Sequence, residues 1–260
     1  MEALRKEVII QILTNIRDNI KNATEEEYSD NDWYRELIWE DDLEDYFETI
    51  NYKTVMNIED RLAIDAVNYP ESFPIIGEIV EGITKINNNY WNSPIDVDSE
   101  WSAGSFFATR LALASKKAED LSLFAHHLAT RDLDHEADPF CSFGVWEIIK
   151  ELGYSDKTMP VLIAFFSANS QHRHEYFTWD DIHNITAYLN QGNNLQRFFE
   201  QLASWSRKYN TALEEIFELV LSEALELDED SNEEAEEIFE RIVSGGKIPT
   251  KDDFSSLKRD

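Results

Sequence analysis

The chain has 260 residues, and its 53 acidic and 23 basic side chains give a formal net charge of −30 at pH 7. Hydrophobic residues make up 42% of it, with 15 Phe, 7 Trp and 10 Tyr, which is enough to form a large core and excludes disorder of the bulk of the chain. The negative charge disfavours binding to nucleic-acid phosphates and to anionic membranes, and it favours a basic protein partner.

Glycine and proline are scarce, with 8 and 6 residues respectively. An all-β fold normally uses more glycine in its turns, and nucleotide-binding α/β folds need glycines clustered where a strand meets a helix. Neither pattern is present, so the composition predicts a helical protein.

Cysteine and leader signals point to the cytoplasm. The single cysteine, Cys141, excludes an internal disulfide and lies in an apolar run typical of a buried side chain. The first residues carry charges throughout, so we predict neither a signal peptide nor a membrane span. No G-x-S-x-G motif is present, and we expect no cofactor.

The N-terminal part contains periodic apolar residues that predict helices over residues 2–21, 32–50, 58–68 and 73–86. The polar segment 87–98 then predicts a loop. We place a boundary there, between an N-terminal acidic and aromatic part at residues 1–90 and a helical array at 91–244.

The stretch from Trp101 to Asn169 predicts several short helices that are too apolar to stand alone. Its inward-facing residues should form the main core. They are Leu111, Leu113, Leu121, Phe124, Leu128, Val145, Ile148, Ile149, Leu152, Leu162, Ile163, Phe165 and Phe166.

Several helix boundaries are marked further along the chain. Thr178 and Asp181 have the spacing of a capping box, and Thr211 and Ser231 begin similar patterns. Gly245 and Gly246 should end the last helix. We expect residues 245–260 to be a frayed tail.

The fold class predicted from these elements is all-α. About ten to twelve short helices, joined by short links, should stack as antiparallel hairpins in an irregular HEAT-like solenoid or a compact helical array. No sequence repeat is evident, so a regular solenoid is not established.

The first candidate site is the acidic and aromatic stretch 25–48, which has twelve Asp or Glu side chains and one basic side chain, Arg35. Tryptophan beside carboxylates suits a surface that clamps Lys or Arg side chains, although a solvated helix face would also explain the charge. The residues that we expect to bind a partner are Trp33, Trp39, Glu40, Asp41, Asp42, Glu44, Asp45 and Glu48.

A second acidic run covers residues 223–241, with ten acidic side chains against Arg241. It contains no aromatic residue that we expect to be exposed. The run therefore predicts a solvated helix face rather than a binding surface.

Two groups of histidines and carboxylates form the second candidate site. Asp180 and His183 would share one helix face, whereas the adjacent His126 and His127 point about 100° apart on a helix. Neither group has an H-E-x-x-H or other specific ligand spacing, so we expect no metal. The remaining members are Asp132, Asp134, His135, Glu136, Asp138, His172, His174, Glu175 and Asp181.

These observations favour a non-enzymatic cytoplasmic protein that binds a basic protein. An immunity or antitoxin protein fits, because a nuclease toxin is basic where it holds phosphates and an acidic binder can cover that surface. Two alternatives stay open, a metal-dependent hydrolase that uses the His/Asp groups and a helical scaffold or adaptor.

Overall fold

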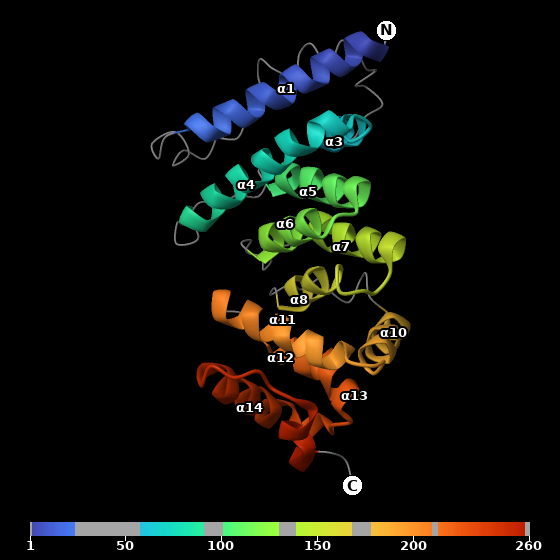
Figure 1. The fold of residues 1–260 in the computed structure, drawn as a ribbon, viewed down its shortest axis with the longest axis vertical. Coiled ribbons are helices and arrows are strands. Elements are labelled where there is room, and N and C mark those ends of the chain that lie inside the picture. The colour runs from blue at the N-terminus through green and yellow to red at the C-terminus, as the bar shows by residue number, and fades with distance from the viewer. Residues whose placement is uncertain are drawn as a thin grey trace.

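The structure is a computed structural model and describes residues 2–23, 58–90, 101–129, 139–167, 178–209 and 213–257. Helices follow one another along a stack whose long axis runs from the N-terminus to the C-terminus (Figure 1). Within the described ranges no strand occurs. The predicted all-α class is therefore confirmed.

The N-terminal end of the stack is built on α1, which packs against α3 and α4. Helix α4 follows a short 3₁₀ turn, η4, which begins at Pro70, and the fixed φ angle of proline restricts the backbone there. The bounds are α1 Glu2–Asn22, α3 Ile58–Ala66, η4 Pro70–Ser72 and α4 Phe73–Tyr90.

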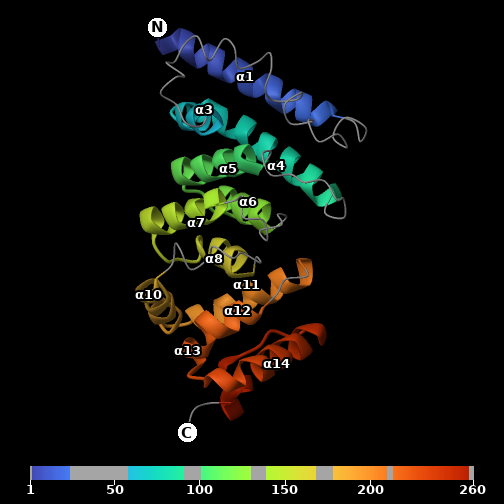
Figure 2. The ribbon, with the colours of Figure 1, turned by 180° about the vertical axis from the view of Figure 1, so that it is seen from behind.

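The middle of the stack is formed by four helices, and α5 packs on α3, α4, α6 and α7 (Figure 2). The most buried helix is α8, in which every residue except Pro160 is buried. The bounds are α5 Trp101–Ser115, α6 Ala118–Ala129, α7 Pro139–Leu152 and α8 Met159–Ser167.

The C-terminal end contains α10, α11, the α12–η5–α13 rod and α14, with η7 packed on α14. In the rod, the π-helix η5 interrupts the two α-helical pieces. The bounds are α10 Trp179–Leu189, α11 Asn194–Lys208, α12 Glu214–Ile216, η5 Phe217–Leu221, α13 Ser222–Leu225, η6 Glu229–Ser231, α14 Asn232–Ser244 and η7 Lys251–Leu257.

One hydrophobic cluster runs through all of these layers, from Ile9 to Leu257. The apolar residues predicted to face inward between Trp101 and Asn169 are buried or packed against this cluster, which confirms that prediction. The cluster crosses the boundary that we placed after residue 90, since α4 packs directly on α5. That domain division stays a prediction about the sequence.

Gly104 allows α6 to approach α5 closely at His127. A Cβ atom on Gly104 would lie 2.7 Å from Cε1 of His127, too close for any real side chain. The imidazole therefore lies directly over the α5 backbone and reaches α4, where its Nδ1 is 3.0 Å from the hydroxyl of Thr84. Because that hydroxyl also donates to the Val80 carbonyl, the His127 Nδ1–H is the donor.

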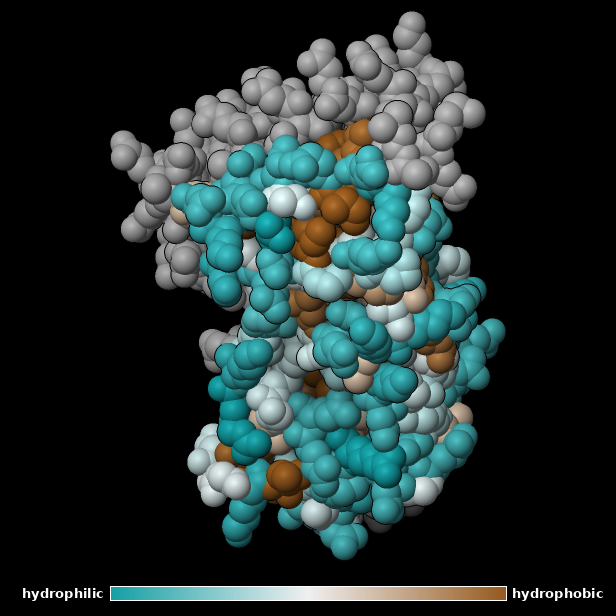
Figure 3. Space-filling model, turned by 45° about the horizontal axis from the view of Figure 1, so that its top comes forward, coloured by the Kyte–Doolittle hydropathy of each residue, from teal (hydrophilic) through white to brown (hydrophobic). Residues whose placement is uncertain are grey.

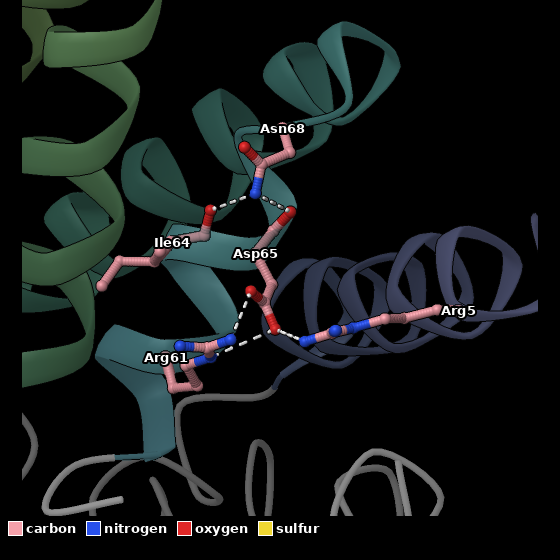
Figure 4. Close-up of polar contacts among 5 residues, drawn as sticks. All are labelled: Arg5, Arg61, Ile64, Asp65 and Asn68. Carbon is pink, nitrogen blue, oxygen red and sulfur yellow. Dashed lines mark hydrogen bonds and ion pairs between the residues drawn. The ribbon is translucent and has the colours of Figure 1, made fainter. Parts of the chain in front are cut away.

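Ion pairs connect the N-terminal helices with one another and with the middle of the stack. Arg110 of α5 contacts Asp60 of α3 and Glu147 of α7, each at 2.8 Å, so one guanidinium joins three helices. Figure 4 shows a second pairing, in which Asp65 of α3 receives Arg5 from α1 and Arg61 from its own helix.

Two expectations about helix ends are confirmed and one is wrong. Thr178 and Asp181 form the predicted capping box, and α14 ends at Ser244, followed by the two glycines. Ser231 does not cap α14, because its hydroxyl donates instead to the Asp228 carboxylate at 2.6 Å.

The expected frayed tail is wrong for residues 251–257. These residues form η7, in which Phe254 is fully buried and stacks on Phe199 of α11 with 5.5 Å between ring centroids. A buried aromatic ring removes a large apolar area from water, which explains why this segment is held against the core.

Among the described residues, the face drawn in Figure 3 is mainly hydrophilic. Figure 3 shows teal residues over most of the visible face, with brown residues gathered mainly in its upper half. Across the described ranges, no helix combines the length and the apolar character that crossing a bilayer requires.

Candidate functional site

The predicted partner-binding residues, from Trp33 to Glu48, lie outside the described residues. The structure therefore does not test that surface, and it stays a prediction. The other sites named from the sequence are described in part.

The histidines that are described make separate contacts. His127 is buried and bonds Thr84, whereas its neighbour His126 bonds the hydroxyl of Tyr209, so the two rings point to different places as predicted. His183 lies 3.0 Å from the Glu223 carboxylate. Asp132, Asp134, His135, Glu136, Asp138, His172, His174 and Glu175 lie outside the described residues.

The two carboxylates of the second histidine group that are described lie at the start of α10. Asp181 is engaged in the capping box with Thr178, while Asp180 is exposed. Within the described ranges, no three His, Cys, Asp or Glu side chains come close enough to hold a metal ion.

His126 occupies a half-buried aromatic contact between α6 and the end of α11. Its ring lies 5.6 Å from that of Tyr209, and Tyr209 packs on Trp205. Burial, and then the nearby positive charge of Lys208, lower the pKa of His126 below its ordinary value. The lowered pKa favours the neutral imidazole, whose Nδ1 is hydrogen-bonded to the Tyr209 hydroxyl in a structural contact.

The largest change from the sequence-based interpretation concerns the second acidic run, residues 223–241. Part of it forms one wall of an open hollow of about 780 Å³ at the C-terminal end of the stack. We call this feature the acidic hollow. It is lined by Trp179, Glu214, Glu218, Leu219, Asp230, Asn232, Glu233 and Glu236.

Five separate elements bring these residues together. Trp179 begins α10, Glu214 lies in α12, and Glu218 and Leu219 lie in η5. The remaining lining residues come from η6 and the first two turns of α14. The hollow therefore depends on tertiary packing, and no single segment contains it.

Local sequence explains the position of Trp179. It lies three residues before Ile182 and six before Ile185, on the helix face that packs into the core. The capping box fixes the first residue of α10. This helix face therefore continues beyond the edge of the core, where Trp179 is 65% exposed. Among the large hydrophobic residues of the described ranges, the other exposed one is Ile248.

Five carboxylates line the hollow, and none has a cationic side chain within ion-pair distance among the described residues. The effect of these neighbouring negative charges is clearest at Glu236. Its pKa is raised by burial first, and then by the charges of Glu240, Glu214 and Glu233, although the Leu213 N–H donates to it. The hollow is therefore a region of concentrated negative charge.

This arrangement can bind a cation that is larger than a metal ion. The carboxylates lie too far apart to ligate one ion together, yet they surround a space beside an exposed ring face. A guanidinium or ammonium group on a side chain can contact several carboxylates and lie against the indole.

Comparison with known proteins adds no assignment. No protein-family model, no curated protein and no solved structure matches this chain.

Sequence reasoning missed this site for a specific reason. The run 223–241 contains no exposed aromatic residue of its own, and the indole comes from Trp179 in another helix. The available signal was a tryptophan at the first position of a well-marked capped helix, where the sequence alone identifies no partner for it.

Proposed function

We propose that this protein binds a basic protein partner, and that the acidic hollow receives a cationic side chain of that partner. The observation that carries the proposal is the placement of the exposed indole of Trp179 among five carboxylates that have no cation beside them in the described part of the chain. A bound Arg or Lys would gain charge-assisted hydrogen bonds and a cation–π contact.

The charge of the whole chain supports the same function. A net charge of −30 attracts a basic partner over distances near the Debye length, about 10 Å at 0.1 M salt, and raises the association rate. The hollow would then supply the local contacts that slow dissociation. The stretch 25–48, with Trp33 and Trp39, stays a second predicted surface for the same partner.

Among basic partners we favour a nuclease-type toxin domain, with this chain as its immunity or antitoxin protein in the cytoplasm. Such a toxin has a cationic surface for phosphates, and an acidic protein can cover that surface. Co-expression with a candidate toxin tests this class directly, because neutralisation should depend on the hollow.

The first experiment uses a fluorescently labelled hexa-arginine peptide at low salt, with anisotropy as the readout. We expect the double variant Glu218→Gln/Glu233→Gln to weaken binding by about tenfold or more, since each substitution removes a carboxylate from the hollow.

A matched control is available on α14. Glu234 and Glu237 are exposed and do not line the hollow, so Glu234→Gln/Glu237→Gln removes the same charge at another place. We expect this control to weaken binding by less than about threefold through the general field alone. Equal losses in the two double variants, or no binding by the unmodified protein, would reject the proposal.

A further inference from the structure

We draw no further inference here: the strongest candidate, the side-chain cluster of His126, Tyr209, Trp205 and Ser167 where α6 and α8 meet the end of α11, forms its hydrogen bonds within the fold, and the lowered pKa of His126 does not by itself establish a ligand site or a switch.

Discussion

Carboxylate side chains have different surroundings in different parts of the helical stack. In the N-terminal and middle helices carboxylates meet cations: Arg110 bridges Asp60 and Glu147, and Asp65 receives two arginines. At the C-terminal end, the carboxylates of the acidic hollow face one another and an exposed indole, with no cation beside them in the described part of the chain.

This difference indicates which carboxylates of the protein are available to bind a partner. A carboxylate paired within the fold has already exchanged water for a cation, so it offers little to a partner. Unpaired carboxylates in a hollow repel one another and gain when a cation arrives. On the function proposed above, the high net charge indicates the kind of partner, and the carboxylates of the hollow indicate where it would bind.

The largest expected effect is a loss of folding stability, and it tests which contacts stabilise the C-terminal end of the stack. Because the described residues form no ion pair with the carboxylates of the hollow, we expect the aromatic core below it to provide most of the stability of this end. Phe254→Ala should cost about 3–5 kcal/mol of unfolding free energy, since it empties a fully buried site that stacks on Phe199.

Chemical denaturation measures this cost, with Ile248→Ala as the control. Ile248 is 41% exposed, so its truncation should cost less than about 1 kcal/mol. A change below that size at Phe254 would show that η7 is held only weakly.

The next largest effect is expected from a variant that breaks the ion pairs of Arg110. Arg110→Met removes a cation that joins three helices and leaves Asp60 and Glu147 partly buried without it, so we expect a loss of about 1–3 kcal/mol. Lys116→Met breaks an exposed pair with Glu151 and should cost at most about 1 kcal/mol. Equal costs would mean that the three-helix bridge contributes no more than a surface pair.

The smallest effect concerns pH at the hollow. Burial and neighbouring carboxylates raise the pKa of Glu236, so the folded state holds its proton more tightly than the unfolded state does. That contribution to stability is fully present below the unfolded pKa, about 4.3, and is lost as pH rises through the folded value.

Glu236→Gln should therefore stabilise the protein near pH 7, by less than about 1 kcal/mol, and the gain should vanish below about pH 4. Thermal unfolding of both proteins between pH 4 and pH 7 measures the difference. A gain that is independent of pH would assign the effect to something other than this proton.

Features of the fold with local causes could be predicted from the sequence. The capping box at Thr178 uses residues three apart, and the inward faces of the helices follow from periodic apolar residues. The end of α14 at Gly245 is equally local. Each of these signals lies within a few residues of the structure that it determines.

Features that depend on distant packing could not be predicted. Phe254 lies in a polar tail, and its burial depends on a ring in α11. Ser231 has the residue type and spacing of a cap, but the nearby Asp228 competes for its hydroxyl. The acidic hollow combines Trp179 with residues of α14, and only the packing of α10 beside the rod brings them together.

The most direct test of the central claim observes Trp179 itself. The indole N–H signal of Trp179 can be assigned in a nitrogen–proton NMR spectrum as the one that disappears in Trp179→Phe. On addition of hexa-arginine at low salt, the account predicts that this signal shifts in a saturable manner, and that Glu218→Gln/Glu233→Gln largely abolishes the shift while Glu234→Gln/Glu237→Gln keeps it. A Trp179 signal that stays in place while the peptide binds would contradict the account, because the cation would then be held elsewhere on the acidic surface.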